Sequence, residues 1–138
     1  MKSRVLALAL ILAAGGNALA ADRRSPEGAS VYIVAPAHGE VVSSPVKVVF
    51  GLSGMGVAPA GMDEINTGHH HLLVDTALPD FNTPIPSDDR YRHFGGGQTE
   101  VVIELAPGEH TLQLLFADYT HSPHIPPVVS EQITITVR

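Results

Sequence analysis

The chain has 138 residues, among them 8 lysines and arginines, 14 aspartates and glutamates, 8 histidines and no cysteine. A net charge of −6 and the lack of a basic cluster argue against nucleic acid or an anionic lipid surface as a partner. The lack of cysteine excludes disulfide bonds, and it excludes a blue-copper centre, which requires a cysteine thiolate.

The N-terminal segment has the pattern of a secretory signal peptide. Two basic residues precede an apolar run over residues 5–14, and residues 18–20 read Ala-Leu-Ala, a small-x-small cleavage pattern. The apolar run is shorter than the roughly 20 residues that a membrane-spanning helix needs. We therefore expect cleavage near Ala20/Ala21 and a periplasmic or secreted mature protein that does not insert into a membrane.

The remainder of the chain has the hydrophobic pattern of β-strands, because apolar residues recur at every second position and no segment has helical spacing. The pattern predicts strands over residues 31–34, 46–52, 69–76, 99–105, 110–118 and 129–137, with one or two short strands between Ala77 and Gln98. We therefore expect an all-β fold, an immunoglobulin-like antiparallel β-sandwich of about seven strands. It would form a single domain over residues 31–138, after a short polar leader over residues 21–30.

This topology predicts that six of the eight histidines gather at one end of the sandwich. Consecutive strands of an immunoglobulin-like sandwich run antiparallel, so successive loops fall alternately at the two ends. The start of strand 69–76, the approach to strand 99–105 and the loop after strand 110–118 then share one end. The histidines placed there are His69, His70, His71, His93, His121 and His124, whereas His38 and His110 are placed in turns at the opposite end.

The spacing of these histidines suits chelation of a metal ion. Residues i and i+2 of a strand lie on the same face, about 6.6 Å apart at roughly 3.3 Å per residue. His69 and His71 can therefore lean onto one ion, while His70 faces the other way. Prolines beside His121 and His124 restrict the loop and lower the entropic cost of binding. Which face of strand 69–76 belongs to the core stays open, because its apolar residues fit either phase.

Imidazole ligands suit copper, zinc and nickel alike. Met55 and Met62 lie in the loop before the triple histidine, and a thioether favours Cu(I), although methionine is also a common packing residue. Copper is therefore the expected ion, with zinc as the alternative. Asp118 either orients a ligand histidine through a hydrogen bond or binds the backbone of its own turn.

These patterns favour a periplasmic metal-binding protein that binds, stores or delivers copper, and they favour a binding protein over an enzyme. The chain has no nucleophile elbow and no zinc-protease helix motif, and a mature chain that starts at Ala21 has no N-terminal histidine for a copper-monooxygenase brace. The alternative is a non-catalytic interaction or scaffolding domain of the cell envelope without bound metal. Its histidine end would then recognise another periplasmic protein.

Four blocks of the sequence resemble an uncharacterised bacterial family, domain of unknown function 4399. The resemblance extends from about Val31 to Val137, and its blocks contain all six histidines predicted to converge. It implies an exported, single-domain β protein and supplies no activity. The blocks are Gly68-His69-His70-His71-Leu72-Leu73, Ile85-Pro86-Ser87-Asp88, His93-Phe94-Gly95-Gly96-Gly97-Gln98-Thr99-Glu100 and the stretch from His121 to Ile135.

Overall fold

The structure is a computed structural model, and it describes residues 22–138. The predicted signal peptide, residues 1–20, lies outside the described residues. Between residues 22 and 138 the chain forms strands and no helix, so that range contains no helix able to cross a membrane. The strands are β1 (Ser30–Ala35), β2 (Val41–Val42), β3 (Val46–Ser53), β4 (Gly56–Val57), β5 (Thr67–Val74), β6 (Tyr91–His93), β7 (Glu100–Ile103), β8 (Gly108–Ala117), β9 (Pro123–Val129) and β10 (Ile133–Val137).

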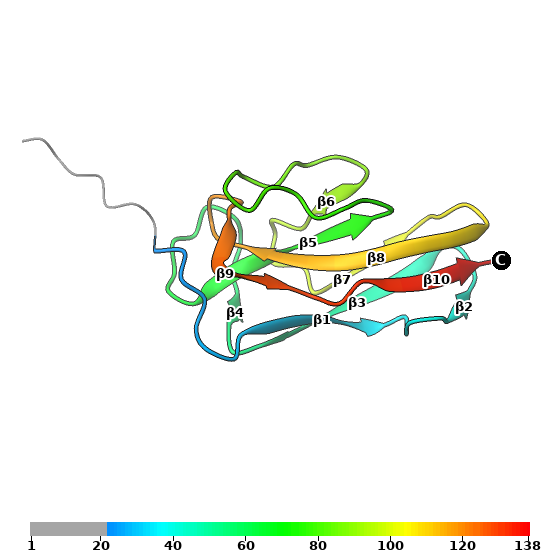
Figure 1. The fold of residues 1–138 in the computed structure, drawn as a ribbon, viewed down its shortest axis with the longest axis horizontal. Coiled ribbons are helices and arrows are strands. Elements are labelled where there is room, and N and C mark those ends of the chain that lie inside the picture. Colours follow the sequence, from blue (N-terminus) through cyan, green and yellow to red (C-terminus); the bar gives the residue numbers. More distant parts are fainter. Residues whose placement is uncertain (1–21) are drawn as a thin grey trace, which may run out of the picture.

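Two sheets pack against each other, which confirms the predicted all-β sandwich (Figure 1). The smaller sheet has the order β1-β3-β7, and the larger has the order β2-β10-β8-β5-β4, with β6 also paired to β5 and β9 also paired to β8. Most pairs are antiparallel, but β2 pairs parallel to β10 and β4 parallel to β5. Strand β6 lies where a short strand was expected, between Ala77 and Gln98. The strand number exceeds the expected seven because β2 and β4 have only two residues each, too few to show alternation in the sequence, and because β9 was not expected.

The predicted strand over residues 129–137 was wrong in its extent. The predicted range covers β10 and only the last residue of β9, which begins at Pro123, and residues 130–132 between them are not in a strand. The two strands pair with successive parts of β8. The predicted loop therefore shrinks to a turn over residues 118–122, and His124 lies in a strand. Three prolines in β9 argued for a loop, yet proline is tolerated where a strand lies at a sheet edge and its nitrogen need not donate.

Strand alternation buries both faces of β5. Leu72 and Val74 point into the main core between the sheets, together with apolar residues of β3, β8 and β10. Leu73 points to the outer face, where it packs with Leu115 and Ile85 in a second apolar cluster. The segment over residues 75–90 covers that face and lies above the sheet in Figure 1, on the side away from β1. Both faces of the strand are thus core, which is why its apolar residues fit either phase.

Candidate metal centre

The triple histidine is divided between the two faces of β5. His69 and His71 lie opposite Ala117 and Leu115 of β8, on the outer face, whereas His70 lies opposite Phe116, on the inner face. All three side chains are buried. Alternation along one strand therefore brings His69 and His71 side by side, with ring centroids 4.9 Å apart, and sends His70 into the main core.

His93 reaches the same place through strand pairing. Strand β6 runs antiparallel to β5 at the sheet edge, and His93 lies directly opposite His71. The two ring centroids are 5.0 Å apart, and the His93 ring also lies 5.0 Å from that of His69. His93 is therefore part of the sheet and not of the loop that leads into β7.

His121 comes from the turn between β8 and β9. Its φ of 66° lies in the left-handed region, which a residue other than glycine adopts only when its surroundings impose it. Asp118 imposes it here. The Asp118 Oδ1 atom accepts hydrogen bonds from Thr120 N at 2.8 Å, Thr120 Oγ1 at 2.6 Å and Ser122 N at 3.0 Å, and His121 N donates to Asp118 O at 3.0 Å.

The four side chains His69, His71, His93 and His121 form a compact group, hereafter the histidine tetrad. One ring nitrogen from each lies within 4.8 Å of all the others, and His69 Nε2 lies 3.2 Å from His121 Nδ1. Around a tetrahedral ion with bonds of about 2.0–2.1 Å, ligand nitrogens lie roughly 3.4 Å apart. The tetrad could therefore hold a metal ion after small movements of the rings.

Burial favours the neutral form of three imidazoles of the tetrad, those of His69, His71 and His93. Desolvation, together with the neighbouring imidazoles, lowers the pKa of His69 to about 4 and that of His71 to about 2. Desolvation also lowers the pKa of His93, with His121 adding to the effect. Neutral imidazoles at neutral pH have free lone pairs, which is the state that a metal ion needs.

The tetrad also contains polar atoms that lack partners. His69 Nδ1, His71 Nδ1 and His93 Nε2 are buried with no hydrogen-bond partner among the described residues. A buried polar atom without a partner destabilises a fold by about 1–3 kcal/mol. Orphaned nitrogens on three of the four imidazoles of this compact group therefore fit a bound cation.

His70 and His124, which the sequence also placed among the ligands, are not brought into this group. His70 packs between Phe50 and Phe116, with both ring centroids 5.0 Å from its own, and His124 stacks on Phe116 at 5.8 Å. Burial lowers the pKa of both histidines. The six histidines thus share one end of the molecule, but the sheet separates two of them from the other four.

The remaining sequence candidates have other surroundings. Met55 is partly buried against the main core, and the Met62 side chain is exposed. Asp118 is buried, and its Oδ1 atom binds the backbone of its own turn, which is one of the two roles predicted for it. Its Oδ2 atom has no hydrogen-bond partner among the described residues.

The two turn histidines lie far from the tetrad. His110 binds Asp75 Oδ2 through Nδ1 at 2.7 Å and Ala106 O through Nε2 at 2.8 Å. His38 accepts a hydrogen bond from Thr134 N through Nδ1 at 3.1 Å. Both side chains have hydrogen-bond partners of their own, and two of these contacts tie the turns to other parts of the fold, so their surroundings give them a structural role.

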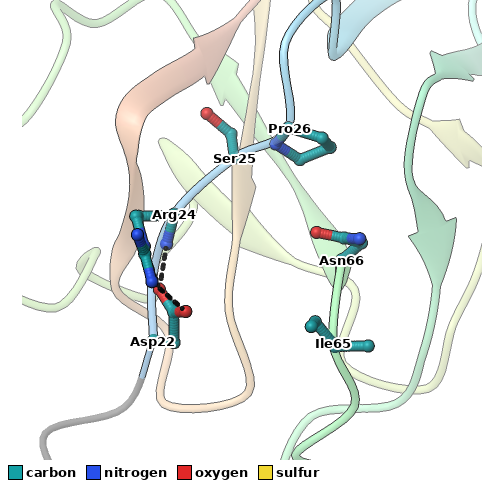
Figure 2. A pocket seen from close by; sticks show the side chains of 6 residues that line it. All are labelled: Asp22, Arg24, Ser25, Pro26, Ile65 and Asn66. Atoms are coloured by element: carbon teal, nitrogen blue, oxygen red, sulfur yellow. Dashed lines mark hydrogen bonds and ion pairs between the residues drawn. The ribbon is translucent and has the colours of Figure 1, made fainter.

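Figure 2 shows an open pocket of about 280 Å³ that the sequence did not predict. It lies between the N-terminal segment and the residues just before β5. The N-terminal segment runs beside β9, where Ser25 N donates a hydrogen bond to Ile125 O at 3.1 Å. Its only basic side chain, Arg24, is paired with Asp22 at 2.9 Å, so it holds no free cationic group for a ligand. The residues around it are Asp22, Arg24, Ser25, Pro26, Ile65 and Asn66.

The chain was compared with known protein families, curated proteins and solved structures. Residues 48–138, which contain the whole tetrad, match the family described as Domain of unknown function (DUF4399). No curated protein and no solved structure matches the chain. The resemblance seen in the four sequence blocks is thereby confirmed, and the protein belongs to the DUF4399 family.

Proposed function

We propose that this protein is an exported metal-binding protein that holds one copper ion in the histidine tetrad. The observation that carries the proposal is the geometry of the tetrad, in which four ring nitrogens from β5, β6 and the turn after β8 lie within 4.8 Å of one another. The pattern of residues 1–20 supports a periplasmic or secreted location.

The donor set supports copper over other ions. Four imidazoles without a carboxylate disfavour calcium and magnesium, which prefer oxygen ligands. Among the divalent ions that imidazole suits, Cu²⁺ binds most tightly in the general order of affinities, and more tightly than Zn²⁺. The surroundings of Met55 and Met62 give no thioether support for Cu⁺, so Cu²⁺ is the proposed ion.

The number of ligands supports binding, storage or delivery over catalysis. A catalytic zinc-type site keeps one position open for water or substrate, whereas a site closed by four protein ligands does not. Two ligands, His69 and His71, are buried on a central strand, and the other two are only partly buried. A bound ion would therefore have its accessible side toward His93 and His121.

The test uses the untagged mature chain, residues 21–138, because an affinity histidine tag would itself bind copper. Copper content is counted after purification from copper-supplemented cells, and affinity is measured by titration against a chelator. We expect about one ion per wild-type chain, and a loss of affinity of at least about tenfold in His71→Ala and His121→Ala. Nitrogen splitting in the electron paramagnetic resonance spectrum would identify imidazole ligands.

Two matched controls come from the same chain. His70→Leu removes a histidine next to the tetrad but on the other face of β5, and His38→Ala removes one from a distant turn. Both are expected to bind copper as the wild type does. Equal copper retention by the tetrad variants would rule out these ligands, and a wild-type chain without metal would favour the scaffolding alternative.

A further inference from the structure

A glycine lies against one ligand of the tetrad. If Gly95 carried a Cβ atom, that atom would lie 2.3 Å from Cε1 and 2.6 Å from Nε2 of His93. Both distances are far below van der Waals contact. The edge of the His93 ring therefore occupies the space in which any other residue at position 95 would have its side chain.

The need for glycine at position 95 is steric and does not come from the backbone. Gly97 has a φ of +83°, which favours glycine whatever its neighbours, but Gly95 is not among the residues with positive φ. Alanine could therefore adopt the backbone conformation of Gly95. Its methyl group would have to displace the His93 ring.

The His93 ring has little room to move. Its other neighbours are the rings of His69, His71 and His121, with centroids 5.0, 5.0 and 4.7 Å away. The backbone of Gly95 is itself fixed, because Gly95 O accepts a hydrogen bond from Ala60 N at 2.8 Å. A side chain at position 95 would therefore push the ring out of the tetrad or separate the strands around it.

We propose that Gly95 is a positioning residue of the metal centre, because its missing side chain lets the His93 ring lie against the backbone and face the other three imidazoles. The inference rests on the proposed function for its copper readout. The steric part concerns the protein without metal and can be measured separately.

The first measurement compares Gly95→Ala with Gly96→Ala in copper titrations of the mature chain. The three atoms nearest to a Cβ at position 96 would all belong to the side-chain amide of Gln98, at 3.1–3.3 Å, and that side chain is exposed and can turn away. We expect Gly95→Ala to weaken copper binding by about tenfold or more and Gly96→Ala to stay within about twofold. Equal affinity of Gly95→Ala and the wild type would overturn the inference.

The second measurement repeats Gly95→Ala in a His93→Ala background, where the ring that it would displace is gone. Gly95→Ala should then cost much less copper affinity and much less Tm of the metal-free protein than it costs in the wild-type background, because of the three nearest atoms only the Ala60 Cβ atom, at 3.2 Å, still crowds the added methyl group. Should Gly95→Ala alone fail to fold, the double variant should fold. The same loss in both backgrounds would show that Gly95 does not act through His93.

These two readouts separate the inference from the proposed function. A wild-type chain that binds no copper would refute the proposed function, whereas the Tm comparison in the metal-free protein would still decide whether Gly95 fixes the His93 ring. A wild-type chain that binds copper, with no coupling between Gly95 and His93, would refute the inference alone.

Discussion

His69, His70 and His71 are neighbours in the chain, yet they have different surroundings in the molecule. His69 and His71 meet two further imidazoles on the outer face of β5, and His70 lies between two phenylalanines on the inner face. The alternation of a strand predicts this separation, and the sequence analysis placed His70 on the opposite face for that reason. Strand alternation does not predict whether the histidine on a given face lies beside other ligands or in the apolar core.

His110 provides a pH-dependent contact at the opposite end of the molecule. Its hydrogen bond to Asp75, followed by that to Ala106 O, raises its pKa above the ordinary value of 6.5. Because the folded protein holds this proton more tightly than the unfolded chain, the contact stabilises the fold fully below pH 6.5. That stabilisation is lost as the pH rises through the raised pKa.

We therefore expect His110→Gln to cost more stability at pH 5.5 than at pH 8.5. The difference should stay below about 1 kcal/mol, since the Asp75 side chain is 45% exposed and solvent screens the pair. Urea denaturation of both proteins at the two pH values measures it. A cost that is independent of pH, or larger at pH 8.5, would contradict the assignment of a protonated His110.

The turn over residues 118–122 is the element that brings the last ligand to the tetrad. The carboxylate of Asp118 accepts three hydrogen bonds within it, and Ile85 N donates to His121 O at 2.8 Å from the covering segment. A positive φ at His121 has to be held by such bonds. The position of this imidazole therefore depends on a side chain that does not itself belong to the tetrad.

We expect Asp118→Ala to destabilise the protein by about 1–3 kcal/mol, because three donors lose their acceptor, and to weaken copper binding through His121. Asp118→Asn keeps an acceptor oxygen at the same place and should retain most of both. Urea denaturation and copper titration measure the two effects. If alanine and asparagine cost the same, the carboxylate oxygen is not what holds the turn.

The elements that the sequence predicted well are the long strands. Strands β3, β5 and β8 lie within a few residues of their predicted ranges, since each has eight or more residues and supplies several apolar side chains to the core. Strand β6 has three residues, and β9 contains three prolines, so neither has a pattern that alternation can reveal. The sequence could thus predict the strands on which His69 and His71 lie, but not the pairing that places His93.

At the scale of the whole molecule, the order of the strands was enough to predict which histidines share an end. It was not enough to predict which share a face, because that depends on the register of β8 against β5 and on the covering segment. The requirement for glycine at position 95 was also hidden in the sequence, where it is one of three successive glycines. Only the spatial neighbours of each glycine distinguish their roles.

A copper ion in the tetrad would stabilise the whole fold, because the unfolded chain does not hold the four imidazoles together. At a free copper concentration 100 times the Kd, the expected gain is about 2.7 kcal/mol, which raises the Tm by several degrees. Thermal unfolding of metal-free and copper-loaded protein measures it. His121→Ala should show a smaller rise, and an equal rise would mean that the stabilising ion binds elsewhere.

Ile85 of the covering segment, residues 75–90, links the outer apolar cluster to the tetrad. The side chain of Ile85 packs with Leu73 and Leu115, while its main chain holds the carbonyl of His121. If the covering segment opened, it would expose the apolar cluster to water and would also break the hydrogen bond that holds His121. Entry of solvent and release of a bound ion would then occur together. Hydrophobic residues that never touch the ion would in this way set how long it stays.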